Sequence, residues 1–198
     1  MEYIRALMGM ATTLEREVKL RFGSVDEARE AVQRTAATPL RCRRLQEDAL
    51  LDDASETLRQ RRCVLRVRVE SGKSLLTFKG PVQASPMKLR EELETVVGDG
   101  EMLLRVLKEL GLHVWFRYEK YREEFAYEDV IVAIDETPVG IYVEIEGSEQ
   151  GIASTAEALG KTTSDYISES YRGLFLKLRG ECGLTGQDMV FDETDGGR

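Results

Sequence analysis

The chain has 198 residues, of which 36 are acidic and 28 are basic, so its formal net charge is −8. Apolar residues make up 42% and charged residues 32%, which is typical of one globular domain and excludes a disordered, collagen-like or membrane-spanning chain. The acidic sum also argues against a general nucleic-acid binder, because phosphate chains attract a basic surface.

The charges are distributed unevenly along the chain. Residues 41–90 carry twelve bases and six acids, whereas residues 91–198 carry ten bases and twenty-four acids. Taken alone, chance clustering and a buried charged site explain this segregation equally well.

The pattern predicts one domain over residues 11–180. Residues 1–10 do not join it and are predicted to be an N-terminal extension, so that either Met1 or Met10 could start translation. Residues 181–198 are rich in Gly, Asp and Thr and are predicted to be a disordered tail. The beginning of the chain lacks a secretory signal, and the three cysteines show no CxxC spacing. These features predict free thiols and a cytoplasmic location.

Apolar and charged residues alternate in several segments, which is the period of a β-strand. In the first segment Glu15, Glu17 and Lys19 share one face, and Val18 and Leu20 lie on the other. Strands are expected over eight segments: 14–22, 46–51, 65–70, 75–79, 88–94, 114–122, 130–135 and 141–146. Eight strands are enough to close a barrel.

Four segments predict helices. Ser24 and Glu27 have the spacing of a capping box at the start of the first. Glycines follow the last apolar residues of the other three, as at helix C-termini. The predicted helices span residues 25–36, 99–110, 149–159 and 164–178.

The charged faces of the strands have two interpretations. Any one strand is explained by a solvated outer face. As a set, however, they place like charges side by side, as at Glu15 and Glu17 or Arg66 and Arg68. Paired carboxylates suit a divalent cation, and paired guanidinium groups suit phosphate.

Common enzyme plans are missing from the sequence. His113 is the single histidine, and there is no GxSxG, Walker A, GxGxxG or HExxH motif. A carboxylate–metal and arginine–phosphate chemistry remains, in which Mg²⁺ would bridge acids to a triphosphate.

The residues that carry this chemistry resemble the CYTH superfamily, also called triphosphate tunnel metalloenzymes. Residues 15–19 read Glu-Arg-Glu-Val-Lys, which is similar to the ExExK signature of that family. The resemblance continues in order along residues 46–52, 65–68, 76–81, 90–94, 120–122, 135, 140–147 and 170–174. It implies an α+β fold, in which an eight-stranded antiparallel β-barrel forms a tunnel with a charged interior and flanking α-helices.

The resemblance also implies roles for individual residues. The implied metal ligands are Glu15, Glu17, Asp135, Glu144 and Glu146. The residues implied to bind triphosphate are Lys19, Arg66, Arg68, Lys79, Arg90, Lys120 and Arg122, of which Lys120 and Arg122 are the candidate catalytic residues. Arg90, Glu92 and Glu94 face inward by phase, where they would either bind substrate or form an internal ion-pair network. A C-terminal helix holding Tyr171 would lie beside the tunnel mouth.

The family contains cyclases and hydrolases. The segment 140–147 and the block Lys120-Tyr121-Arg122 are more similar to class IV adenylate cyclases than to thiamine triphosphatases, which favours conversion of ATP to cyclic AMP and pyrophosphate. Hydrolysis of an organic or inorganic triphosphate is the alternative, and a non-catalytic polyphosphate- or nucleotide-binding module is a third. The expected cofactor is Mg²⁺ or Mn²⁺, as two ions. The expected partners are a triphosphate substrate and a second copy in a homodimer, without nucleic acid or membrane.

Overall fold

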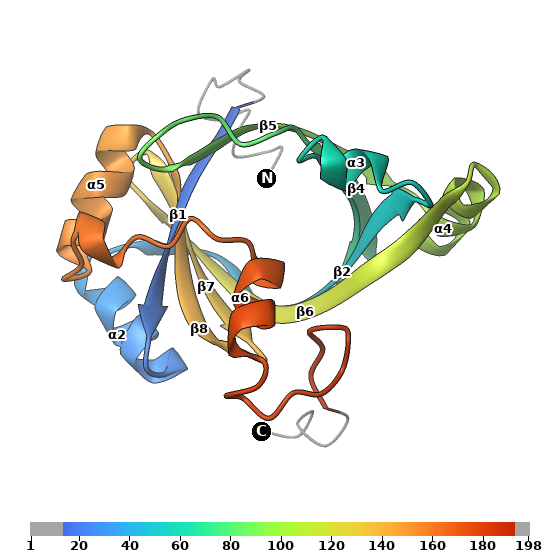
Figure 1. Ribbon diagram of the computed structural model, residues 1–198. Helices are drawn as coiled ribbons and strands as arrows, with labels where there is room; N and C mark the ends of the chain where they lie inside the picture. Colours follow the sequence, from blue (N-terminus) through green and yellow to red (C-terminus); the bar gives the residue numbers. More distant parts are fainter. Residues whose placement is uncertain (1–13, 193–198) are drawn as a thin grey trace.

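A computed structural model describes residues 14–192 of the chain (Figure 1). The predicted N-terminal extension and the choice between Met1 and Met10 as the start lie outside these residues.

Eight antiparallel strands close into a barrel, as expected from the alternation. Neighbours around the ring follow the order β1-β5-β4-β3-β2-β6-β7-β8. Figure 1 looks into the barrel, with β5 at the top and β6 at the bottom. The strands are β1 Leu14–Phe22, β2 Thr38–Asp53, β3 Val64–Glu70, β4 Lys73–Lys79, β5 Lys88–Val97, β6 Leu112–Tyr127, β7 Val130–Thr137 and β8 Gly140–Gly147. The expected barrel with a charged interior and flanking helices is therefore confirmed.

The described residues form five α-helices. They are α2 Val25–Arg34, α3 Thr57–Gln60, α4 Gly100–Glu109, α5 Glu149–Ala158 and α6 Tyr171–Leu178, with a 3₁₀ turn at Thr163–Asp165. The capping expectation for α2 is confirmed, because the Ser24 hydroxyl accepts a hydrogen bond of 3.1 Å from the Glu27 amide. The short helix α3 was not expected.

The expectation of one helix over residues 164–178 is wrong. The chain between the 3₁₀ turn and α6 is extended, and Ile167 exchanges two backbone hydrogen bonds with Lys19 of β1. Ser170 then caps α6 through a 3.1 Å hydrogen bond from the Gly173 amide. In this segment the backbone groups of Ile167 bond to β1, so they are not available for helical hydrogen bonds.

The hydrophobic core lies outside the barrel wall. One cluster packs α2 and α5 against β1, β7 and β8, and includes Val32, Ile145 and Ile152. Figure 1 shows both helices on the same outer side of the barrel. A second cluster packs Phe175 of α6 against Phe116 of β6. Because the helices bury the outer face, the charged side chains are left to face inward.

The segment expected to be a tail packs against the barrel over its described part. Strand β6 extends beyond its pairing with β7. Met189 covers this edge, where it donates a hydrogen bond to the Arg117 carbonyl and accepts one from the Glu119 amide. The Met189 side chain is fully buried. No helix within residues 14–192 has the length and apolar character needed to cross a membrane.

Asp52 fixes the turn that leads from β2 into α3. Its buried carboxylate accepts hydrogen bonds from the amides of Asp53, Leu58 and Arg59 at 2.9–3.0 Å and from Arg59 Nε at 3.2 Å. Burial opposes ionisation, but these donors outweigh it and hold the pKa of Asp52 below its ordinary value.

We expect Asp52→Asn to lower the free energy of unfolding by about 1–3 kcal/mol, because the amide cannot accept all of these hydrogen bonds. A carboxyl with a lowered folded pKa stabilises the protein above its unfolded pKa of about 4 and loses this effect as the pH falls through the folded value. Urea denaturation should thus show the largest difference at neutral pH and a smaller one in acid. Asp53→Asn, at a more exposed carboxylate, should cost less. Equal stability of the wild type and Asp52→Asn at neutral pH would contradict this interpretation.

Candidate active site

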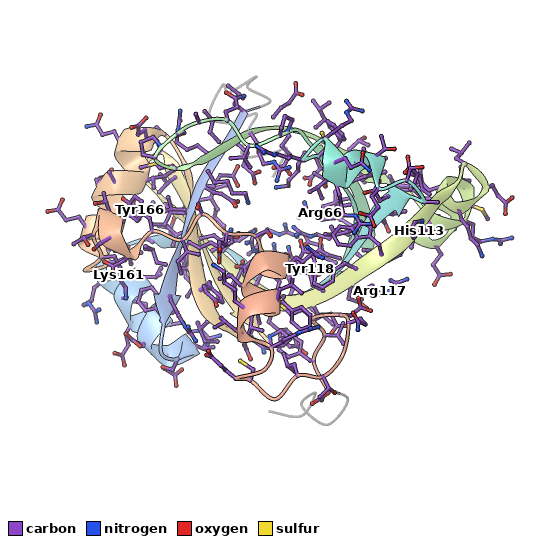
Figure 2. The ribbon with its side chains drawn as sticks, in the orientation of Figure 1. Arg66, His113, Arg117, Tyr118, Lys161 and Tyr166 are labelled. Carbon is purple, nitrogen blue, oxygen red and sulfur yellow. The ribbon has the colours of Figure 1, made fainter. Side chains whose placement is uncertain are left out.

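The barrel encloses a cavity of about 500 Å³ lined mainly by charged side chains. Figure 2 shows side chains that project into the central opening, with Arg66 at its edge. His113 lies away from the opening and is exposed. Of the residues implied by the family resemblance, the cavity wall contains Glu15, Glu17, Lys19, Arg66, Arg68, Lys79, Arg90, Lys120, Arg122, Glu144 and Glu146.

Four carboxylates from two neighbouring strands form one side of the cavity. Glu15 and Glu17 lie on β1, and Glu144 and Glu146 lie on β8. Glu17 stands directly opposite Glu146 in the β1–β8 register, so their side chains start about 5 Å apart. We call these four residues the acidic wall.

The positive charge of Lys79 does not fully compensate the buried carboxylate of Glu15. Burial, with smaller contributions from Glu17, Glu92 and Glu146, raises the pKa of Glu15 to about 8 against the opposing effect of Lys79. At Glu17 burial also opposes ionisation, but Lys19 and Lys88 outweigh it and hold the pKa well below its ordinary value. A second cation near Glu15 would favour its ionised form.

The acidic wall has the chemistry of a divalent metal site. Carboxylate oxygens are the ligands that Mg²⁺ and Mn²⁺ prefer. The oxygens are held by lysine and arginine side chains, as in the 2.9 Å pair of Lys19 and Glu17 and the 2.7 Å pair of Lys79 and Glu15. No group of three or more acidic, histidine or cysteine side chains converges within residues 14–192. The donor set fits such an ion once these ammonium groups release the carboxylates.

Two arginines on β3 and a lysine on β4 form a second, basic part of the cavity wall. We call Arg66, Arg68 and Lys79 the basic wall. In the closed ring of eight strands β3 lies four places from β8, so Arg66 and Arg68 face the acidic wall. Lys79 lies on β4, only two places from β1, and its ammonium group reaches Glu15 at 2.7 Å. Arg68 is held by Asp48 through two hydrogen bonds of 2.9 and 3.2 Å.

Arg66 keeps donor capacity toward the cavity. Its Nη2 atom donates to Thr77 at 3.1 Å. Its buried Nε atom makes no hydrogen bond within residues 14–192, although Asp48 lies 3.4 Å away as an ion-pair partner. A buried donor of this kind gains from an anionic acceptor.

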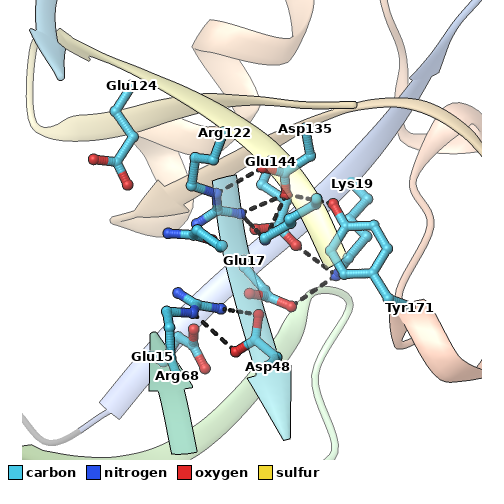
Figure 3. A network of polar contacts seen from close by, with 12 residues as sticks. Glu15, Glu17, Lys19, Asp48, Arg68, Arg122, Glu124, Asp135, Glu144 and Tyr171 are labelled. Atoms are coloured by element: carbon cyan, nitrogen blue, oxygen red, sulfur yellow. Dashed lines mark hydrogen bonds and ion pairs between the residues drawn. The ribbon is translucent and has the colours of Figure 1, made fainter. Parts of the chain in front are cut away.

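Asp135 joins the candidate catalytic residues behind the cavity wall. Its carboxylate accepts hydrogen bonds from Lys120 at 2.8 Å and from Arg122 at 2.6 and 2.5 Å, and also from the Tyr171 hydroxyl (Figure 3). Arg122 also pairs with Glu144 of the acidic wall. Asp135 is fully buried and is not part of the cavity lining. Lys120 and Arg122 each contact both Asp135 and Glu144, so Asp135 lies close to one of the four glutamates with which the resemblance groups it and also orients the two cations; its role as a metal ligand stays a prediction.

Lys120 is electrostatically unusual. Burial, and after it the neighbouring charge of Arg122, lowers its pKa to about 8 against the opposing effects of Asp135 and Glu144. By contrast, burial is outweighed at Arg122, where Asp135 and Glu144 hold the pKa well above its ordinary value. The pair presents one permanent cation and one cation of reduced pKa to the same cavity.

The inward residues of β5 divide into two groups. Glu92 pairs with Lys79 at 2.9 Å, and Glu94 accepts a hydrogen bond from Thr77 at 2.8 Å, so both belong to an internal polar network. Arg90 donates to the backbone carbonyls of residues 79 and 80 at 3.2 and 2.9 Å. These carbonyls carry no full charge, and Arg90 therefore remains a candidate for binding an anion.

Several cavity residues were not assigned a role from the sequence. Lys88 is buried against Glu17 and has the same strand phase as Arg90, a signal that could have identified it. Asp48 lies in the phase of the charged face of β2 but outside the cavity lining, where it holds Arg68. Arg59, Trp115 and Arg172 line the cavity from α3, β6 and α6, and no local pattern brings these distant segments together.

Comparisons with known proteins agree with this geometry. The CYTH domain family matches residues 13–171. A relative from Methanocaldococcus jannaschii, named as a candidate adenylate cyclase, is 27% identical over 178 residues, which cover 84% of this chain and 99% of the relative.

Solved structures share the fold. A Vibrio parahaemolyticus protein named as a candidate adenylate cyclase has a TM-score of 0.73 and 19% identity, covering 83% of this chain and 99% of that one. A Hippeastrum protein, described as an adenylyl cyclase candidate with a dominant triphosphatase activity, has a TM-score of 0.64 and 20% identity, covering 82% and 95%.

The structure is a closed barrel around a cavity lined mainly by charged side chains. The chain belongs to the CYTH domain family. Proteins of this family bind triphosphate substrates and use divalent metal ions.

We expect Asp135→Asn to lower the free energy of unfolding by about 3 kcal/mol, because it leaves the buried Lys120 and Arg122 with Glu144 as their single shared counter-charge within residues 14–192. Tyr171→Phe removes one donor from the same carboxylate and should cost only about 1 kcal/mol. Urea denaturation at neutral pH measures both changes. If Asp135→Asn were no less stable than Tyr171→Phe, the orienting role of Asp135 would be wrong.

Proposed function

We propose that this protein is a divalent-metal-dependent enzyme that converts ATP to 3′,5′-cyclic AMP and pyrophosphate. The observation that carries the proposal is the pairing of an acidic wall with a basic wall across one cavity of about 500 Å³. A pure anion binder gains nothing from four glutamates that repel its ligand, whereas a metal-dependent enzyme needs them.

Each wall has a separate task in the proposed reaction. Glu15, Glu17, Glu144 and Glu146 would hold Mg²⁺ or Mn²⁺, as two ions, which when bound neutralise phosphate charge. Arg66, Arg68 and Lys79 bind the triphosphate, with Lys19 and Arg90 beside them. Arg66 contributes an Nε donor that makes no hydrogen bond within residues 14–192, and the guanidinium planes of Arg66 and Arg68 suit pairs of phosphate oxygens.

Lys120 and Arg122 act on the reacting phosphate. In a cyclase the ribose 3′-oxygen forms a bond to the α-phosphorus, the bond from that phosphorus to the β-phosphate oxygen breaks, and the hydroxyl proton is released. Negative charge then develops on the departing pyrophosphate. Asp135 holds both cations in a fixed orientation, so they stabilise this charge without first having to reorganise.

Hydrolysis of the triphosphate is the second candidate, favoured by the triphosphatase activity described for the Hippeastrum protein of similar fold. The name of the Methanocaldococcus relative favours the cyclase. Both reactions use the same walls and differ in whether a ribose hydroxyl or a water molecule attacks. A cytoplasmic location and a homodimer remain predictions.

Product analysis distinguishes the two reactions. We expect incubation with ATP and Mg²⁺ or Mn²⁺ to yield cyclic AMP and pyrophosphate. Parallel incubations with thiamine triphosphate and tripolyphosphate should yield little inorganic phosphate. Release of inorganic phosphate without cyclic AMP would assign the protein to the hydrolases, and no turnover of any of the three would contradict an enzymatic role.

We expect the double variant Glu15→Gln, Glu17→Gln to lose at least about 100-fold in turnover with Mg²⁺, because neutral amides are poor ligands for hard cations. Its affinity for tripolyphosphate in EDTA, measured by calorimetry, should not fall. Glu30→Gln, at an exposed glutamate on α2, is the matched control and should keep full turnover. Unchanged turnover in the double variant would rule out the acidic wall as the metal site.

For the basic wall we expect Arg66→Gln to weaken tripolyphosphate binding in EDTA by about tenfold or more at fixed salt, because a charge-assisted contact is lost. Arg105→Gln, at an exposed arginine on α4, should bind like the wild type. Circular dichroism checks that both variants are folded. Retained binding in a folded Arg66→Gln protein would count against the phosphate-binding role.

A further inference from the structure

A cluster of cationic side chains and one indole ring lies at the α3 and α6 end of the tunnel. It consists of Arg59 and Arg62 from the α3 region, Trp115 from β6 and Arg172 from α6, and all four residues line the cavity. Figure 1 shows α3 and α6 at opposite margins of the central opening. We call these residues the mouth cluster. None of them belongs to the acidic or basic wall.

Two arginines of the mouth cluster contact the same aromatic ring. The guanidinium carbon of Arg59 lies 4.4 Å from the centre of the Trp115 ring, and that of Arg172 lies 4.7 Å from it. Such cation–π contacts hold a guanidinium group in place against the ring. They leave N–H groups at its edge for hydrogen bonds in its own plane.

Only one of these arginines has its charge compensated. Arg59 pairs with Asp52 at 3.2 Å and with Glu56 at 2.9 Å. Within residues 14–192, neither Arg172 nor Arg62 forms an ion pair with a carboxylate. The cluster therefore carries an excess of positive charge at the entrance of the cavity.

The surroundings of Arg172 disfavour its charge. Its side chain is partly buried, and burial together with the nearby charge of Arg59 lowers its pKa, with Glu56 opposing. An anion bound at this position would relieve both effects. A guanidinium group also has only donors to offer, which suits an anionic ligand.

We propose that the mouth cluster is an outer oxyanion subsite, which binds a phosphate group of a linear polyphosphate that extends beyond the triphosphate held between the walls. This inference rests on the proposed function of the inner cavity, since the inner walls must hold the first phosphates. Arg62 and Arg172 donate to the outer phosphate, and Arg59 and Trp115 position Arg172.

The same chemistry excludes other occupants. A cationic organic group would meet three arginines and be repelled. A neutral aromatic group would have to displace a guanidinium group that already contacts the indole ring. An oxyanion needs neither change, because fork-shaped donors match two phosphate oxygens at once.

The test compares two ligands of different length by calorimetry in EDTA at constant ionic strength. The ligands are tripolyphosphate and a linear polyphosphate of defined, greater length, and the quantity measured is the ratio of their dissociation constants per chain. We expect the wild type to bind the longer chain more tightly by about tenfold or more, and Arg172→Gln and Arg62→Gln each to reduce this ratio by several-fold. Arg105→Gln, which lies on α4 outside the cavity lining, should keep the wild-type ratio.

The outcomes separate this inference from the proposed function. If tripolyphosphate binds but neither Arg172→Gln nor Arg62→Gln changes the ratio in a folded protein, the outer subsite is wrong and the inner site stands. If tripolyphosphate does not bind the wild type at all, the proposed inner site is wrong, and the outer subsite that rests on it is overturned with it. If Trp115→Ala weakens ATP binding while the ratio stays constant, the mouth binds an aromatic group and the oxyanion assignment is overturned.

Discussion

The barrel depends on one constraint, which is that charges taken out of water must be paired. Its interior contains glutamates, lysines and arginines that are almost fully buried, among them Lys19, Glu17 and Lys120. An isolated ion in such a place costs several kcal/mol, and the cost is offset only by a close partner and further hydrogen bonds. Lys19 meets this condition through Glu17 and Glu144, at 2.9 and 3.1 Å. The arrangement of the strands is thereby tied to the arrangement of charges.

This constraint also determines where the apolar residues pack. Because the inside of the barrel holds charges, hydrophobic burial takes place between the strands and the helices that cover them. Val18 and Ile145 project outward from β1 and β8 against α2 and α5. Phe116 and Phe175 do the same between β6 and α6. The helices supply the stability that a barrel of this size normally obtains from a packed interior.

The sequence predicts the barrel well for a physical reason. The side-chain period of a strand is two, so a charged residue at every second position must share one face. This rule places Glu15, Glu17 and Lys19 together, as the structure does. The rule gives no information about how deeply each side chain is buried, however, so it does not distinguish the fully buried Asp135 from its neighbour Glu144, which lines the cavity.

Elements that depend on distant contacts were harder to predict. The segment before α6 has helical spacing, but its backbone pairs with β1 across more than one hundred residues of chain. Met189 likewise becomes buried only because β6 extends beyond β7 and leaves an edge to cover. The mouth cluster joins α3, β6 and α6 and has no local signature. In each case tertiary contacts override local preference, which a single sequence does not show.

The ion pairs inside the barrel connect stability with the proposed function. Lys19 and Lys79 now hold carboxylates that would otherwise repel one another. If a triphosphate and its metal ions enter together, the same ammonium groups can turn to phosphate oxygens while the glutamates turn to the ions. The number of contacts between opposite charges then stays the same. No buried side chain is left without a partner when the substrate binds. A net charge of −8 on the whole chain is compatible with this, since the interior attracts phosphate through the local placement of its cations and not through their sum.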